Sequence, residues 1–229
     1  MKYLLIFSFA VYSQLAGASI SEGLKAVRES QFAVAMQHFQ DAANQGDPAG
    51  LHLVASMHYQ GLGVDKDTDK AKRLYEQAAQ SNYAPSLANL GVMHMLGDGV
   101  KQDYAIALDY YQRAASLGDQ LSMFNIGQFF RKGTGVDQDF QQAANWYLKA
   151  AQGGYIPAQN EIALLYAKGQ GVQENIIEAF AWISLPAAAG DQQAIQNREL
   201  ILEAMDDNQR QIALQKAKQY LQQFGNSRR

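Results

Sequence analysis

The stretch "GLGVDKDTDKAKRLYEQAA", Gly61 to Ala79, decides how the rest of the chain is interpreted. Taken alone, it allows two chemical interpretations. The Gly-x-Gly that opens it could belong to a phosphate-binding loop. Asp65, Asp67 and Asp69 could belong to a calcium-binding loop. If the stretch recurs along the chain at a fixed spacing, it is a structural repeat and neither chemical interpretation is needed.

The stretch recurs in four copies that are 36 residues apart, without insertion or deletion. Each copy opens with two glycines and a valine: Gly61, Gly97, Gly133, Gly169; Gly63, Gly99, Gly135, Gly171; and Val64, Val100, Val136, Val172. Each continues with one polar and several apolar columns: Asp67, Asp103, Asp139, Asn175; Ala71, Ala107, Ala143, Ala179; Leu74, Tyr110, Trp146, Trp182; Tyr75, Tyr111, Tyr147, Ile183; and Ala79, Ala115, Ala151, Ala187.

These columns predict a pair of helices joined by a tight loop. The glycines suit a connection that needs positive φ. The Asp/Asn column suits the N-cap of a second helix, and the pairs Asn175/Glu178 and Asp139/Gln142 have the spacing of a reciprocal capping box. The alanine and aromatic columns form one apolar helical stripe.

A glycine or asparagine ends each predicted second helix: Gly46, Asn82, Gly118, Gly154 and Gly190. Such residues tolerate the left-handed conformation that closes a helix. No single hairpin of this kind can bury its apolar face, so neighbouring hairpins must stack. The expected fold is an all-α solenoid.

The segments "LGVMHMLGDGVKQDYAIALDYYQRAASLGD" (Leu90–Asp119) and "IGQFFRKGTGVDQDFQQAANWYLKAAQGGY" (Ile126–Tyr155) resemble the Sel-1-like repeat family, a relative of the tetratricopeptide repeat. We expect a right-handed superhelix of stacked helix-turn-helix repeats with a period of 36 residues. The expected organisation is a signal peptide (1–18), a degenerate tetratricopeptide-like hairpin (19–47), four repeats (48–83, 84–119, 120–155, 156–191), C-terminal capping helices (192–224) and a tail (225–229).

The N-terminal sequence "MKYLLIFSFAVYSQLAGAS" has the three parts of an export signal. Lys2 precedes an apolar run from Tyr3 to Tyr12, and Ala16-Gly17-Ala18 supplies a cleavage site with small residues. The apolar run is too short for a permanent membrane span. We therefore expect export to the periplasm or the medium after cleavage near Ala18, with no integral membrane span in the mature protein.

Composition excludes some partners. The formal net charge is −3 and the pI about 5.8, so no basic surplus is available to neutralise nucleic-acid phosphates. The chain has no cysteine, so neither a disulfide nor a lipid-modified cysteine can form.

The recurrence also removes the first two chemical interpretations. The sixth position of a calcium loop needs glycine, and here it is Lys70. No Gly-Lys-Ser/Thr follows the glycines as a phosphate loop requires. The four histidines do not have metal-ligand spacing, and no cofactor or metal is expected; they are His38, His52, His58 and His94.

No catalytic residue is predicted. The chain lacks Ser-x-x-Lys, Gly-x-Ser-x-Gly and His-Glu-x-x-His signatures. The resemblance includes cysteine-rich relatives linked to β-lactamase or penicillin-binding activity, but this chain has neither their cysteines nor a nucleophile constellation.

First helices of stacked hairpins line the concave face of a solenoid, where variation between repeats selects a partner. The candidate groove residues are Asn89, Asn125, Glu161, Gln128, Phe129, Met57, Met93, Lys132 and Lys168. The asparagines are expected to hydrogen-bond a peptide backbone, and Met57, Met93 and Phe129 to supply adaptable apolar contact. Alternatively, some of these side chains bridge neighbouring repeats.

The predicted function is that of an exported, non-enzymatic, monomeric scaffold or adaptor that binds a protein or peptide in this groove. Two alternatives stay open. One is a β-lactamase-like or peptidoglycan-binding protein of the cell envelope, and the other is a secreted effector that engages a host protein.

Overall fold

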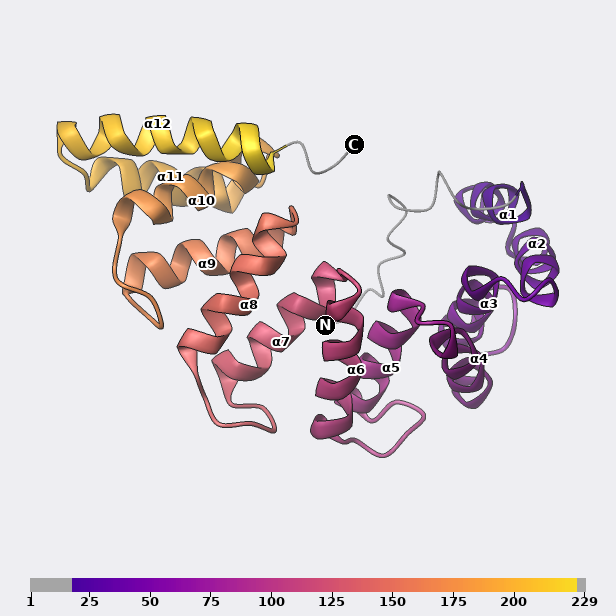
Figure 1. The fold of residues 1–229 in the computed structure, drawn as a ribbon. Coiled ribbons are helices and arrows are strands. Elements are labelled where there is room, and N and C mark those ends of the chain that lie inside the picture. The colour runs from indigo at the N-terminus through magenta and orange to yellow at the C-terminus, as the bar shows by residue number, and fades with distance from the viewer. Residues whose placement is uncertain (1–17, 226–229) are drawn as a thin grey trace. The chain divides into compact units, whose positions relative to one another are not determined.

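The computed structural model describes residues 18–225, which form twelve helices and no strand (Figure 1). The predicted signal peptide lies outside the described residues except for Ala18, and the predicted tail lies outside them except for Gly225. The helices are α1 (Ala18–Arg28), α2 (Phe32–Asn44), α3 (Pro48–Gln60), α4 (Thr68–Gln80), α5 (Ala84–Leu96), α6 (Tyr104–Ser116), α7 (Gln120–Lys132), α8 (Phe140–Gln152), α9 (Ile156–Lys168), α10 (Ile176–Ala188), α11 (Gln192–Glu203) and α12 (Asp207–Phe224).

The all-α repeat solenoid is confirmed. Every helix from α2 to α10 has 13 residues, and corresponding helices of successive repeats begin 36 residues apart. The first helix of a repeat packs against its own second helix, as α7 does against α8 and α9 against α10. The chain divides into two compact units at Tyr110/Tyr111, inside α6, and each unit is described by itself below.

Side-chain caps begin the second helices at the predicted positions. The Asp67 carboxylate accepts a hydrogen bond from the Lys70 backbone N–H at 2.8 Å. The corresponding residues of the other copies accept in the same way: Asp103, Asp139 and Asn175. Each cap satisfies backbone donors that the first helical turn leaves unpaired.

The predicted reciprocal capping boxes of Asn175/Glu178 and Asp139/Gln142 are wrong. In each case the N-cap backbone N–H is already used, because it donates to a carbonyl of the preceding helix, Tyr166 or Phe130, at 2.9 Å. Glu178 instead holds α12, where it contacts Lys216 and accepts a hydrogen bond from Tyr220 at 2.8 Å.

The repeated glycines close the first helices and their loops. Gly61, Gly97, Gly133 and Gly169 all have φ between 62° and 71°. The second glycine of the loop lies against the start of the second helix in the preceding repeat. A methyl group on Gly171 would overlap the backbone of Phe140, and one on Gly63 would lie 2.5 Å from the Phe32 Cβ. These loops therefore require glycine for both conformation and space.

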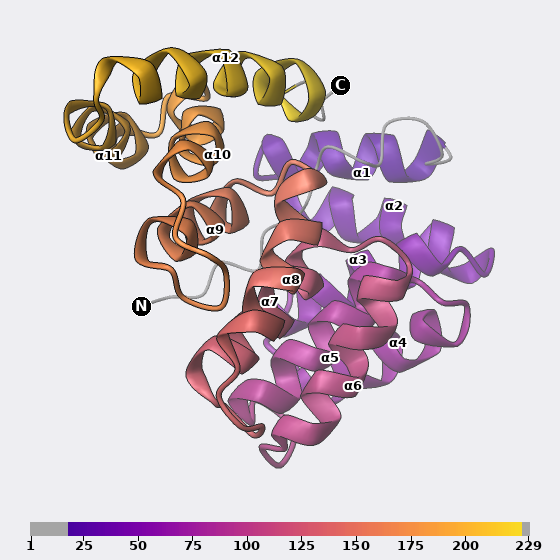
Figure 2. The same ribbon diagram turned by 60° about the vertical axis from the view of Figure 1, so that its left-hand side comes forward.

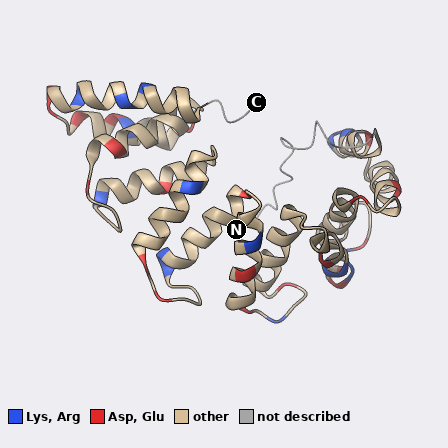
Figure 3. Ribbon diagram, in the orientation of Figure 1, with Lys and Arg blue, Asp and Glu red and all other residues tan. Residues whose placement is uncertain are grey.

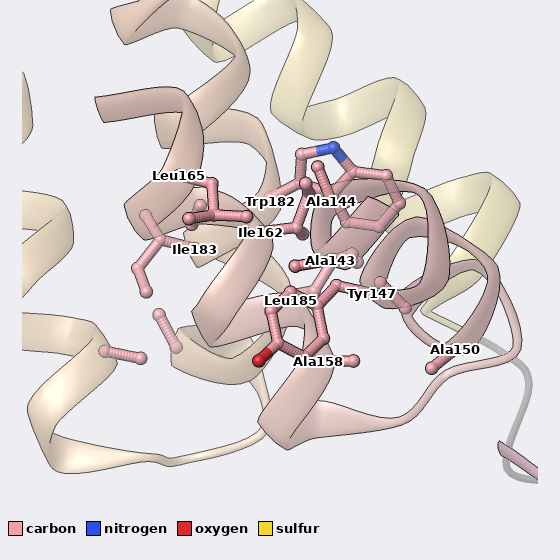
Figure 4. Close-up of a cluster of buried hydrophobic side chains, with 14 residues drawn as sticks. Ala143, Ala144, Tyr147, Ala150, Ala158, Ile162, Leu165, Trp182, Ile183 and Leu185 are labelled. Atoms are coloured by element: carbon pink, nitrogen blue, oxygen red, sulfur yellow. The ribbon is translucent and has the colours of Figure 1, made fainter. Parts of the chain in front are cut away.

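The apolar columns of the second helices form the core. Ala71, Ala143 and Ala179 are fully buried, and so are Tyr75 and Tyr147. In the second unit, Ala143, Tyr147, Ile162 and Trp182 belong to one continuous cluster that joins α8, α9 and α10 (Figure 4). Burial of this stripe between neighbours stabilises the stack, since no single hairpin covers it.

Helices α11 and α12 both pack on α10 and end the stack (Figure 2). Trp182 stacks on Phe224 with ring centroids 5.3 Å apart and meets the edge of Tyr220 at 4.8 Å. Ala213 and Ala217 lie buried on the same face of α12. The outer face of α12 is largely polar, as a terminal cap requires.

We predict that Gly171→Ala destabilises the protein more than Gly118→Ala. Both glycines have positive φ, which costs alanine about 1 kcal/mol. Only at Gly171 does the added methyl group also meet backbone atoms, whereas it meets open space at Gly118. Urea unfolding should give a loss of about 1 kcal/mol for Gly118→Ala and about 2–4 kcal/mol for Gly171→Ala. Equal losses would show that the loop can move away from Phe140.

Candidate interaction face on the first helices

Three of the predicted groove side chains are buried in the core. Met57 is 0% exposed, Met93 is 1% and Phe129 is 2%. They occupy one column of the first helices, and that column is buried; Phe129 on α7, for example, meets the edge of Tyr111 on α6, the second helix of the preceding repeat, at 5.9 Å. The prediction that these three side chains contact a ligand is corrected, because they have almost no accessible surface.

In the first unit, Asn89 belongs to a buried polar network around Tyr75. The Tyr75 hydroxyl and the Ser56 hydroxyl are 2.9 Å apart. Burial raises the pKa of Tyr75 to about 12, and hydrogen bonds from Ser56 and from Asn89 oppose this shift. The Tyr75 hydroxyl is therefore satisfied within the protein, and Asn89 bridges two neighbouring repeats.

His52 forms a second buried contact between repeats of this unit. Its Nδ1 lies 3.0 Å from the Ser86 hydroxyl, and its ring packs against Tyr75 and Tyr83 with centroids 5.4 Å away in both cases. Burial lowers the pKa of His52 to about 3. This side chain is a neutral core group whose Nδ1 is used in the contact with Ser86.

In the second unit, three half-buried polar side chains join α7 to α9. The Gln128 amide donates to Glu161 Oε1 at 3.4 Å, and Arg131 Nη2 donates to Gln128 Oε1 at 3.1 Å. Arg131 Nε and Glu161 Oε2 form an ion pair at 3.8 Å, which is too long for a hydrogen bond. We call Gln128, Arg131 and Glu161 the α7–α9 cluster.

Tyr147 lies beneath this cluster and corresponds to Tyr75, 72 residues earlier. It is fully buried, and its hydroxyl has no hydrogen-bond partner among the described residues. Burial and the charge of Glu161 raise the pKa of Tyr147, whereas the charge of Arg131 and its approach to the hydroxyl as a hydrogen-bond donor lower it. Gln128 and Glu161 stand where Ser56 and Asn89 satisfy Tyr75, but they bond to each other.

The remaining predicted residues flank the cluster. Lys132 and Lys168 are exposed at the ends of α7 and α9, where Figure 3 shows basic residues. Asn125 is half-buried on α7. Leu164 lies one turn beyond Glu161 on α9 and is 42% exposed. The face of the second unit thus combines cations, one carboxylate and one exposed apolar side chain.

Sequence reasoning missed Arg131 and treated Tyr147 as core alone. Arg131 shares a column with Tyr59, Met95 and Ala167. A single charged residue in an otherwise uncharged column was the signal that could have identified it. The unpaired hydroxyl of Tyr147 left no signal, because it depends on how side chains from two repeats meet.

Residues 18–225 contain no group of three or more His, Asp or Glu side chains placed to hold a metal ion. Over the same residues, no helix combines the length and apolar character that a bilayer span requires.

The fold and the face together define a helical repeat protein of the solenoid class. The family model of the Sel1 repeat matches residues 15–47, 48–83, 84–119, 120–155 and 156–191. The chain belongs to the Sel1 repeat family, whose members are generally non-catalytic scaffolds for protein–protein interaction. A search of curated protein sequences finds no significant match to this chain.

Solved structures share the fold. A Sel1 repeat protein from Oxalobacter formigenes is 23% identical, with a TM-score of 0.71 over 89% of this chain and 83% of that one. The immunity protein Pa5087 from Pseudomonas aeruginosa is 18% identical, with a TM-score of 0.55 over 91% of this chain and 84% of that one. The immunity protein PA5088 from the same organism is 20% identical, with a TM-score of 0.55 over 86% and 80%.

We predict that His52 makes the protein less stable in mild acid. Because the folded-state pKa is depressed, the neutral ring contributes full stability above the unfolded pKa of 6.5, and this contribution falls as pH decreases toward 3. Between about pH 7.5 and about pH 5, this residue should remove about 2 kcal/mol.

The repeats supply a matched control for that measurement. Phe124 and Ala158 occupy the positions of His52 and Ser86 two repeats later, and Phe124 packs on Tyr147 and Tyr155 at 5.5 and 5.3 Å. Urea unfolding of His52→Phe/Ser86→Ala should show a smaller loss between these pH values than wild type. The same loss in both proteins would exclude His52 as its source.

Proposed function

We propose that this protein is an exported, non-enzymatic scaffold whose first-helix face in the second unit binds a protein or peptide partner. The observation that carries the proposal is the α7–α9 cluster. Polar side chains from two successive repeats meet there, and the side chains of Arg131 and Glu161 remain 31% and 23% exposed.

The charge of the face supports a partner with acidic groups. Arg131, Lys132 and Lys168 place three cations on α7 and α9, against one carboxylate from Glu161, in a chain whose formal net charge is −3. A local positive field on an acidic protein favours encounter with an acidic surface. Leu164 adds an exposed apolar contact beside these charges.

Family membership supports a binding role over catalysis. In a stacked repeat the second-helix columns are committed to packing, so the variable first-helix positions are free to specify a partner. A scaffold function also explains why Gln128, Arg131 and Glu161 differ from their counterparts Ser56, Tyr59 and Asn89, while the alanine and tyrosine columns of the core carry the same residues in both repeats.

We predict that the mature protein begins at Ser19. Intact mass and N-terminal sequencing of the protein from the extracytoplasmic fraction and the medium of the native host should show loss of residues 1–18, since the small residues before Ser19 fit a signal peptidase. The fraction that holds the mature form separates a periplasmic from a secreted protein. Recovery of the chain with Met1 intact from either fraction would exclude cleavage.

We also predict that reversing two charges on the face removes the partner. Residues 19–229 carrying Lys132→Glu/Lys168→Glu should retain at most about a tenth of the protein that wild type captures from envelope extract at low salt, because a favourable charge pair becomes repulsive. Quantitative mass spectrometry of the captured proteins gives the ratio.

Lys101→Glu/Lys218→Glu makes the same change in net charge at exposed lysines that belong to neither α7 nor α9 and should retain the partner. Circular dichroism checks that all three proteins are folded. Equal loss in both double variants would mean that net charge alone attracts the captured protein. Sedimentation of the protein with isolated sacculi, or hydrolysis of a chromogenic β-lactam, would favour the cell-envelope alternative.

A further inference from the structure

The last hairpin of the stack differs from the other hairpins of the second unit. In those, the first helix packs along its own second helix, as α7 does on α8 and α9 on α10. Helices α11 and α12 each pack on α10 instead and have little direct contact with each other. They meet near their connection, where Arg210 Nε donates to the Leu202 carbonyl at 3.0 Å, and they diverge from there (Figure 2). The last hairpin is therefore open, and α10 forms the floor between its helices.

A cavity of about 310 Å³ occupies this opening. Its floor contains Phe180 and Ser184 of α10, which are 2% and 3% exposed. Its apolar walls come from both helices of the hairpin: Leu202 from α11, and Leu214, Ala217 and Leu221 from α12. Leu214 is 54% exposed, so the cavity opens to solvent. Its volume lies at the lower end of the range of about 300–1,000 Å³ that small-molecule sites occupy.

Two cations stand at the edge of the cavity, one on each helix of the hairpin. They are Arg198 of α11 and Lys218 of α12. Neither side chain has a hydrogen-bond or ion-pair partner among residues 18–225, whereas Lys216, one turn of sequence away, contacts Glu178. One carboxylate, that of the exposed Glu199, also borders the cavity. The edge therefore carries a net positive charge that no group of the described chain neutralises.

The interior of the cavity offers no free main-chain group. All of its lining residues lie within helices, where N–H and C=O groups pair along the helix axis. The carbonyls of Leu202 and Leu221, in the last turns, accept from the Met205 and Gly225 backbone N–H groups. The Ser184 hydroxyl donates to the Phe180 carbonyl at 2.7 Å. A ligand inside the cavity thus meets apolar side chains, and charged groups only at the edge.

We propose that the opening between α11 and α12 binds a medium-chain fatty acid. The hydrocarbon chain lies on Phe180, Leu202 and Leu214, and its carboxylate lies at the edge between Arg198 and Lys218. At roughly 30 Å³ for each water-sized group, the cavity holds a chain of about ten carbons. Burial of that chain from water drives binding, and the two cations fix its direction.

Other ligand classes fit these groups less well. A peptide main chain inside the cavity would lose its hydrogen bonds to water and find no partner for its amides. An amphiphile with a cationic head would be repelled by Arg198 and Lys218. The fatty-acid site shares no residue with the α7–α9 cluster, so it is a second site that does not depend on the proposed partner-binding function.

Calorimetric titration of the purified mature protein with fatty acids, kept below the concentrations at which they form micelles, tests the site. We expect decanoate to bind with a dissociation constant on the order of 100 µM. Affinity should rise about three- to fourfold for each CH₂ from octanoate to decanoate, because each added group is buried. Dodecanoate should bind no more tightly than decanoate, because the cavity is then full. A rise that continues at the same rate to dodecanoate would overturn the proposal.

Two exposed leucines supply a matched pair of variants. Leu214→Asp places a carboxylate in the cavity and should weaken decanoate binding at least about tenfold. Leu200→Asp makes the same change on α11 at a side chain that is 64% exposed and does not line the cavity, and it should bind decanoate as wild type does. Circular dichroism checks that both variants are folded. An equal effect of both substitutions would exclude this cavity as the site.

The charges at the edge give a test with two signs. Arg198→Gln/Lys218→Gln should weaken decanoate binding about tenfold, whereas Lys70→Gln/Lys101→Gln removes two exposed cations of the first unit and should not. Glu199→Gln should strengthen binding about twofold, a gain that misfolding cannot produce.

Three further results would overturn the site. They are decanoate affinity unchanged in Arg198→Gln/Lys218→Gln, equal binding of decyltrimethylammonium, and tighter binding of the peptide acetyl-Gly-Leu-Leu than of decanoate, which would assign the cavity to a polypeptide C-terminus. The titrations need no protein partner, so their outcome is independent of the charge-reversal capture experiment.

Discussion

The close approach of the two helices in each hairpin is the constraint on which the rest of this structure depends. In the hairpin of α7 and α8, a buried tyrosine of the second helix lies directly against a small residue of the first. At Gly127 a Cβ would come within 2.5 Å of the Tyr147 ring, so the backbone of α7 lies almost on that ring. Ala55 is fully buried in the corresponding column of α3, where Tyr75 follows on α4. Large aromatic area is buried at each of these contacts, and the contact recurs because the period keeps both columns aligned.

This packing fixes which positions are free to vary. The second helices use their alanine and aromatic columns for stacking, and their caps and glycines close the loops. The first helices lie between neighbouring second helices, and in α3 every residue from Ala49 to Tyr59 is buried. Only narrow strips of the first helices remain reachable. In the second unit such a strip carries the α7–α9 cluster and the flanking lysines.

Local features of the fold could be predicted because they depend on few residues. The N-cap at Asp67, the positive φ of Gly61 and the core position of Tyr75 each follow from a residue type and its place in the period. The prediction of a capping box at Asn175 was wrong because the Asn175 backbone N–H donates to the carbonyl of Tyr166, nine residues earlier. A local spacing rule has no information about that competitor.

The candidate site was only partly predictable for a related reason. Gln128 and Glu161 are half-buried polar side chains, whereas Met57, Met93 and Phe129 are buried in the core. Periodicity gives the order of positions around a helix, but it does not show where buried positions end and solvent-exposed positions begin. Predicting whether the Tyr147 hydroxyl has a hydrogen-bond partner requires more information than periodicity gives, because the answer depends on the rotamers of side chains from neighbouring repeats.

The central claim is that the α7–α9 cluster serves recognition at a cost in stability. Its most direct test replaces Gln128 by Ser, Arg131 by Tyr and Glu161 by Asn, the residues that the first unit carries at the same columns as Ser56, Tyr59 and Asn89. The measurement is the free energy of unfolding of this triple variant in urea. The account predicts a value equal to wild type or about 1–2 kcal/mol higher, because Tyr147 gains the partners that Tyr75 has. A loss of about 2 kcal/mol or more would contradict it, since the cluster would then be a stabilising contact between repeats.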